Sequence, residues 1–148
     1  MNKYKIAEEI IRLSTSKNWD LAKLEWHLED VYFEDEPETC LCGHTPIIEV
    51  CILKNKNNGN TARVGNICVK KFMGLDSDKI FQSVKRIKKD VTKSLSAEAL
   101  QYAFQKNWIF LKDRDFYISI MKKRLLTEKQ LKWKKDINLR VLSRLSKQ

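Results

Sequence analysis

The chain has 148 residues, enough for one domain with a buried core, and 43 % of them are hydrophobic. This composition, with four glycines and two prolines, excludes a disordered or low-complexity chain. The formal net charge is +10, and no apolar run approaches membrane-spanning length, so we expect a polyanionic partner and no membrane association. The length predicts a single domain over residues 1–148. Because the N-terminus lacks the apolar core of a signal peptide, we expect this domain to be cytoplasmic.

Charge is distributed unevenly along the chain. Residues 1–39 carry 5 Lys/Arg and 10 Asp/Glu, residues 40–75 carry 5 and 1, and residues 76–148 carry 19 and 8. We therefore divide the chain into an acidic helical front, a cysteine-containing middle segment and a basic helical region. The basic part is expected to meet nucleic acid or another polyanion, although Lys-rich helices also occur simply as solvated faces.

The acidic front is predicted to consist of two helices and a loop. Apolar residues at helical spacing predict a helix over residues 4–14. A second helix is expected from residue 18 or 20 to residue 31, with Trp26 in the core or over the next segment. Residues 34–38 then form an acidic loop. His27 is interpreted as a surface or capping histidine.

The segment from Cys40 to His44 has the composition of a metal-binding knuckle. Cys40, Cys42 and His44 lie at i, i+2 and i+4, and Gly43 permits the positive φ that would curl them around one ion. Cys68 lies in the first turn of a predicted helix, where the helix dipole stabilises a thiolate. Zinc takes Cys sulfur and His nitrogen tetrahedrally. We therefore predict a structural Zn²⁺ site formed by Cys40, Cys42, His44 and Cys68.

A β-hairpin is predicted between the knuckle and Cys68. Residues 47–64 contain an apolar β-branched strand, a turn rich in Asn and Gly, and a returning strand. Asn66 is the expected N-cap of a short helix that begins at Ile67 and ends at Gly74. The middle segment is therefore interpreted as a zinc-binding knuckle, hairpin and short helix.

The order of these elements resembles the treble-clef zinc finger over residues 40 to about 75. Treble clefs usually supply two ligands from the helix as C-x-x-C, whereas this chain has Lys71 at the second position. The knuckle must then supply three ligands. The Cys-x-Cys-Gly knuckle, the Val-Gly-x-x-Cys-x-x-x-Phe segment and a later Leu-Thr-x-Lys-Gln pattern also look like small, mostly uncharacterised proteins of phages and mobile elements. That resemblance implies an effector of nucleic-acid machinery.

Other uses of the four cysteines stay open. Cys51 is interpreted as an inert buried thiol, and it is also the alternative fourth ligand in place of His44. Disulfides and an iron–sulfur cluster are further alternatives, but there is no secretory signal, and C-x-C is not a common cluster spacing. His44 as a plain turn residue is the remaining alternative.

The basic region predicts four amphipathic helices. The first covers about residues 77–95, the second is capped by Ser96, and the third begins at Asp113. Thr127 and Gln130 fit the capping box of the fourth. We thus predict a mostly helical α+β fold, in which helices flank a small zinc-bound β-hairpin on both sides in sequence.

Basic residues mark two candidate surfaces for phosphate, one around the hairpin and short helix and one on the helix after Ser77. The expected contacts to DNA or RNA are Lys54, Lys56, Arg63, Lys70, Lys71, Lys85, Arg86, Lys88 and Lys89. We predict a zinc-containing nucleic-acid-binding protein. The alternative is a protein-interaction module that inhibits or adapts a nucleic-acid enzyme, with the acidic front as a possible imitation of nucleic acid.

Catalysis is not expected. No Ser-His-Asp pattern, Gly-rich phosphate loop or paired-carboxylate motif is present. If His44 binds zinc, His27 is the sole histidine left to serve as the base of a metal-dependent nuclease, and it precedes the finger. A nuclease is therefore the lesser alternative.

Overall fold

The computed structural model describes residues 3–145 and has a mixed α+β fold. The chain divides into two compact units, which we call the sheet unit (residues 3–78) and the helical unit (residues 79–145). Across this described range, no helix is both long and apolar enough to span a membrane.

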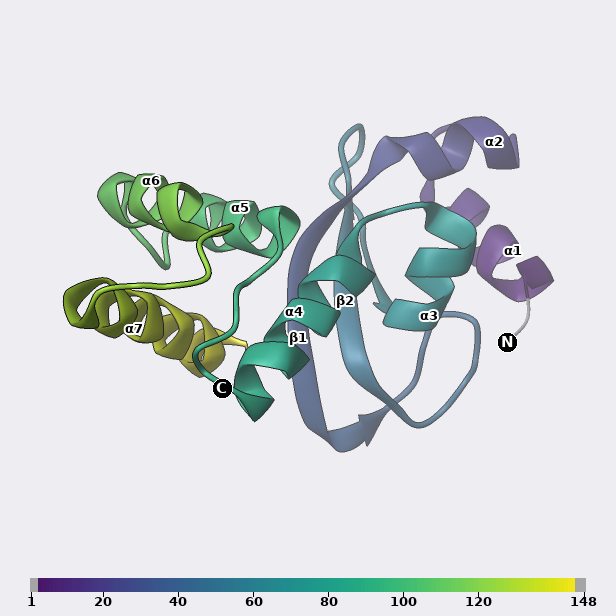
Figure 1. The fold of residues 1–148 in the computed structure, drawn as a ribbon. Helices are drawn as coiled ribbons and strands as arrows, with labels where there is room; N and C mark the ends of the chain where they lie inside the picture. The colour runs from purple at the N-terminus through teal and green to yellow at the C-terminus, as the bar shows by residue number, and fades with distance from the viewer. Residues whose placement is uncertain (1–2, 146–148) are drawn as a thin grey trace. The chain divides into compact units, whose positions relative to one another are not determined.

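The sheet unit is built around three antiparallel strands, β1 (Trp26–Glu38), β2 (Ile47–Asn55) and β3 (Thr61–Gly65), in the order β1-β2-β3 (Figure 1). The hairpin expected over residues 47–64 is confirmed as β2 and β3. Strand β1, however, adds a third and longer strand to it. Apolar residues of all three strands are buried, including Val31, Val50, Leu53 and Val64.

The helix expected to reach residue 31 is wrong. Helical structure there is limited to α2 (Trp19–Ala22), where Asn18 accepts a hydrogen bond from the Leu21 N–H at 3.3 Å, and to the 3₁₀ turn η1 (Lys23–Glu25). Leu21 and Leu24 have helical spacing, but both are exposed. The aromatic and β-branched residues that follow pair with β2 instead. The acidic loop expected at residues 34–38 is the end of β1.

A buried carboxylate connects the N-terminal helix to the sheet. Helix α1 (Lys3–Leu13) is followed by a turn whose Thr15 and Ser16 backbone N–H groups donate to Glu25. Asn55 Nδ2 donates to the same carboxylate at 3.0 Å. Burial alone would raise the pKa of Glu25, but these hydrogen bonds and that of the Thr15 hydroxyl lower it to about 2.

A short helical segment follows β3. It comprises α3 (Asn66–Cys68) and the π-helical turn η2 (Val69–Met73), and it ends at Gly74, whose φ is +67°. Asn66 is the first helical residue and not the N-cap, because its side chain is buried and occupied elsewhere. Its Oδ1 accepts from the Ser77 hydroxyl at 2.6 Å, and its Nδ2 donates to Asp78 at 3.1 Å.

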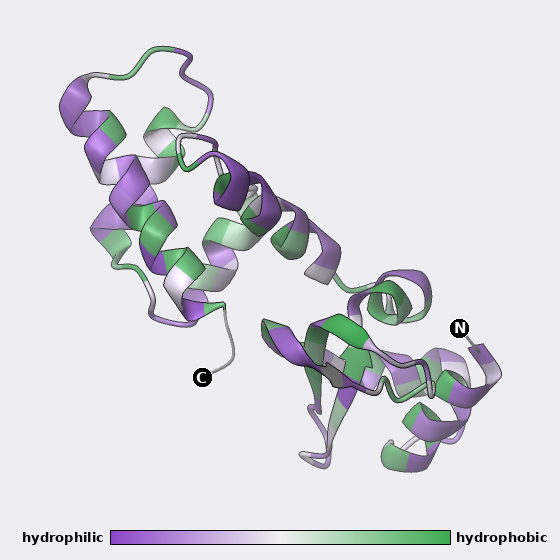
Figure 2. Ribbon diagram, turned by 90° about the horizontal axis from the view of Figure 1, so that it is seen from below, coloured by the Kyte–Doolittle hydropathy of each residue, from purple (hydrophilic) through white to green (hydrophobic). Residues whose placement is uncertain are grey.

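The helical unit contains most of α4 (Ser77–Lys89), together with α5 (Ala97–Gln105), α6 (Leu111–Ile120) and α7 (Glu128–Arg144). Helices α4 and α5 have a hydrophobic and a hydrophilic side (Figure 2). The caps expected at Ser96 and at Thr127–Gln130 are confirmed. Helix α4 ends earlier than the expected Leu95, and Leu95 is nevertheless buried.

Tyr117 fixes the segment after α4 to the last two helices of this group. Its hydroxyl accepts from the Leu95 N–H at 2.9 Å and donates to Asn138 Oδ1 at 2.8 Å. Asn138 in turn donates to the backbone carbonyls of Val91 and Lys93, both at 2.8 Å. All these groups lie inside the helical unit, so the network fixes how α6 and α7 pack there.

Candidate metal centre

Three buried cysteines meet in the sheet unit. Cys40 and Cys42 come from the turn between β1 and β2, and Cys68 comes from α3. Their sulfur atoms all lie within 4.8 Å of one another, and the Sγ atoms of Cys42 and Cys68 are 3.4 Å apart. The three cysteines are therefore positioned to bind one metal ion.

The knuckle backbone closes on itself around Cys40. The Gly43 N–H donates to the Cys40 carbonyl at 2.8 Å, and the Cys40 N–H donates to the His44 carbonyl at 2.9 Å. Gly43 has a φ of +91°, a conformation that side chains with a Cβ rarely adopt. The Leu41 N–H also donates to the Arg63 carbonyl at 3.0 Å, which connects the knuckle to β3.

Backbone N–H groups point at the Cys40 sulfur. Gly65 donates to Cys40 Sγ at 3.2 Å and Cys42 donates at 3.5 Å. A Cβ on Gly65 would lie 3.1 Å from Ile47 Cγ2. The absence of a side chain at Gly65 therefore lets its backbone lie close to Ile47. The Cys68 thiol and these two N–H groups lower the pKa of Cys40 to about 5 against the opposing effect of burial.

The donor set fits a soft or borderline metal such as zinc. A tetrahedral ion with Zn–S bonds of about 2.3 Å would place its sulfurs about 3.8 Å apart. The Cys42 and Cys68 sulfurs are 3.4 Å apart, and no pair of the three exceeds 4.8 Å. Three thiolates this close repel one another, and the pKa of Cys68 is raised, chiefly through its interaction with Cys40. A cation held by these residues would remove that repulsion and allow all three sulfurs to be deprotonated together.

His44 and Cys51 both lie outside this three-cysteine group. His44 is exposed on the knuckle. Cys51 is buried in the middle of β2 opposite Val64, and burial raises the pKa of its thiol to about 12, which suits the interpretation as an inert thiol. All four cysteines are free, so none forms a disulfide.

The nine predicted phosphate contacts are all exposed, and they fall into two sets. Lys54, Lys56, Arg63, Lys70 and Lys71 belong to the sheet unit, whereas Lys85, Arg86, Lys88 and Lys89 belong to α4 in the helical unit. In the first set Arg63 pairs with Glu38 at 2.6 Å and Lys70 pairs with Asp78 at 3.3 Å. Intramolecular carboxylates thus already neutralise two of those five cations.

The two units also differ in net charge. Residues 3–78 carry 10 Lys/Arg and 13 Asp/Glu, whereas residues 79–145 carry 18 and 6, a net charge of +12. Strand β1 alone contributes six carboxylates. His27, the candidate base of a nuclease, lies on this strand with its Nε2 at 2.9 Å from Glu29.

Two exposed aromatic residues of the helical unit were not singled out from the sequence. Phe110 precedes α6, and Trp133 lies on α7 among lysines. For Trp133 the available signal was its place on a predicted helix between Lys132 and Lys134, whereas Phe110 lies in an apolar run and had no such signal. No protein family, curated protein or solved structure matches the chain.

Proposed function

We propose that the three cysteines hold a structural zinc ion in a treble-clef-like arrangement, with His44 as the fourth ligand. The proposal is supported by the thiolate donor set and by the place of the His44 backbone within the closed knuckle. Cys51 is the weaker candidate, because its burial favours the protonated thiol. Four protein ligands leave no position for a substrate, so we propose no catalytic role for the ion.

We further propose that the protein binds nucleic acid and that the helical unit makes the main contacts. The observation that carries this proposal is the two-sided character of α4. Ile80, Phe81, Val84 and Ile87 are buried, whereas Lys85, Arg86, Lys88 and Lys89 are exposed. Lys79 is also exposed and pairs with Glu98 at 3.3 Å. A dense set of cations in a unit of net charge +12 is suited to successive phosphates.

Charge variants test which unit meets the nucleic acid. Lys85→Gln, Lys88→Gln and Lys89→Gln are combined in one protein, and Lys54→Gln, Lys56→Gln and Lys71→Gln in a matched control with the same loss of charge. If three phosphate contacts are lost, the slope of log affinity against log salt becomes shallower by about 2 to 3 units. We expect this change in the α4 variant and a much smaller change in the control. The reverse result would assign binding to the sheet unit.

A second candidate function rests on the sheet unit. Strand β1 is an edge of the sheet and carries six carboxylates, which suits a basic protein partner better than nucleic acid. In that case the protein is an adaptor or inhibitor of a nucleic-acid enzyme, in keeping with the resemblance to phage and mobile-element proteins. A partner that stays bound after nuclease treatment and is lost on β1 charge reversal would favour this function.

A further inference from the structure

Trp133 is held in one orientation and yet remains exposed. Its indole Nε1 donates to Asp113 Oδ1 at 2.9 Å. Its ring stacks on Phe116 with a centroid distance of 3.9 Å and an interplanar angle of 5°. The residue is still 37 % exposed. An indole fixed at its edge and covered on one face by a second ring is a ready platform for another flat ring.

The anchor of this indole is a buried carboxylate. Asp113 also accepts from the Phe110 N–H at 2.9 Å and from Arg140 Nη1 at 3.1 Å. Burial alone would raise the pKa of Asp113, but the bonds from Arg140, the Phe110 N–H and Trp133 lower it. The carboxylate therefore stays ionised at neutral pH, paired with Arg140, and Trp133 stays oriented.

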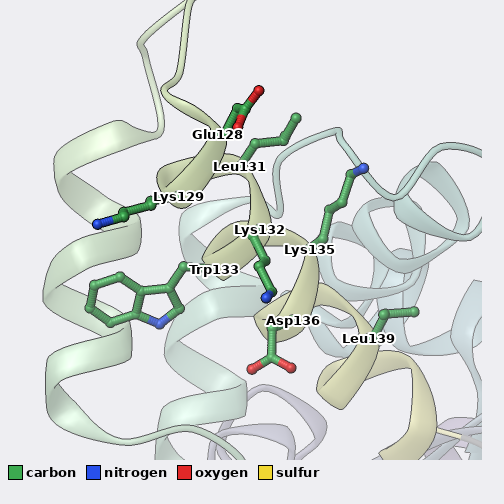
Figure 3. Close-up of a pocket in the computed structure, with 8 residues that line it drawn as sticks. All are labelled: Glu128, Lys129, Leu131, Lys132, Trp133, Lys135, Asp136 and Leu139. Atoms are coloured by element: carbon green, nitrogen blue, oxygen red, sulfur yellow. The ribbon is translucent and has the colours of Figure 1, made fainter.

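Two open hollows share Trp133 in their walls. One, of ≈ 740 Å³, is formed by α7 alone, and its lining side chains are drawn in Figure 3. Trp133 and Lys129 project to one side of the helix there, and Lys135 and Leu139 to the other. The second, of ≈ 430 Å³, is lined by Phe110, Lys112, Asp113, Trp133, Asp136 and Arg140.

These hollows combine flat apolar surface with cations. Phe110 is 69 % exposed beside Trp133 in the second hollow. Lys129 and Lys132 line the first hollow and Lys112 the second, while Lys135 projects to the side of α7 away from Trp133. Asp113, one of the three acidic residues, is already paired with Arg140. The helical unit has a net charge of +12, which favours a polyanionic partner over a peptide with few acidic residues.

We propose that Trp133, with Phe110 beside it, is the stacking platform for an unpaired nucleobase of a single-stranded nucleic acid, and that the adjacent lysines contact its phosphates. This inference rests on the proposed nucleic-acid-binding function and gives it a site and a strand type. Bases in a duplex are already stacked on one another, so an exposed indole favours a strand whose bases are free. Stacking is also tolerant of sequence, because every base has a π-face.

The test compares two probes of equal length and charge. One is a labelled 15-nucleotide oligothymidylate, and the other is the same backbone without bases. We expect the intact protein to bind the first about tenfold more tightly. Trp133→Leu and Phe110→Ser should each reduce this preference with the salt slope unchanged. Leu125→Ser is the matched control, since Leu125 is 90 % exposed in the same unit and lines neither hollow.

Each other outcome has a defined meaning. Equal binding of the two probes by the intact protein overturns the stacking site and leaves nucleic-acid binding in place. Binding of neither probe and of no duplex at low salt overturns the proposed function itself. A dimer that Trp133→Leu dissociates in sedimentation would show that a second copy covers this face, which also overturns the inference. If Trp133→Leu lowers the melting temperature, the result for Phe110→Ser decides the test. The Phe110 side chain is exposed, so its replacement leaves the fold intact.

Discussion

Cys68→Ala and Cys51→Ala form a matched pair that tests the metal centre. Both substitutions remove one sulfur from a buried position, since Cys68 is 2 % exposed and Cys51 is 0 % exposed. The packing loss is therefore similar, about 1 kcal/mol in each case. Of these two, however, only the Cys68 sulfur lies within 4.8 Å of the sulfurs of Cys40 and Cys42. We therefore expect Cys68→Ala to lose the metal and Cys51→Ala to retain it at one ion per chain.

The stability difference between the two variants follows from the linkage between binding and folding. At a free zinc concentration a thousandfold above the dissociation constant, a bound ion adds about 4 kcal/mol to the free energy of unfolding. Cys68→Ala should lose this contribution in addition to the packing term. Urea unfolding with and without a chelator measures it, and metal analysis by mass spectrometry counts the ion. Full metal content in Cys68→Ala would refute the three-cysteine site, whereas loss of the metal in Cys51→Ala would assign the fourth ligand to Cys51 in place of His44.

Three further predictions concern stability. Tyr117→Phe should lower the free energy of unfolding by about 2 to 4 kcal/mol in urea titrations, because it leaves two buried hydrogen-bonding groups without their partner. Gly65→Ala should lower zinc affinity in competition with a chromogenic chelator, because its Cβ would lie 3.1 Å from Ile47; unchanged affinity would contradict this. Glu25 has its pKa lowered to about 2, so its stabilisation is full above the unfolded value of about 4.3 and is lost as pH falls toward 2. In acid unfolding, Glu25→Gln should accordingly lack the loss of stability that protonation of Glu25 causes in the unmodified protein.

The elements that depend on local sequence could be predicted. The capping box at Thr127 and Gln130 and the turn at Gly43 depend on residues within a few positions of each other, and the structure has both. The proximity of Cys68 to the knuckle could also be expected, because a hairpin returns the chain to its start. His44 as the fourth ligand stays a prediction, because it depends on how one exposed side chain is oriented.

Features that depend on long-range pairing were missed. Leu21, Leu24, Leu28 and Val31 have helical spacing, and only the partner strand β2 decides that the last two belong to β1. The orientation of Trp133 depends on a hydrogen bond to Asp113, which lies 20 residues away. No local sequence pattern predicts this pair, because Asp113 alone is explained as a helix cap and Trp133 alone as a core aromatic residue.

The most direct test of the proposed function is the salt dependence of nucleic-acid binding by the intact, zinc-loaded protein. Labelled single-stranded and double-stranded DNA and RNA are titrated over a series of salt concentrations. We predict tight binding at low salt, a steep loss of affinity as salt increases, and preference for single strands. Absence of binding to all four at low salt would contradict the account and assign the cations of the helical unit to a protein partner.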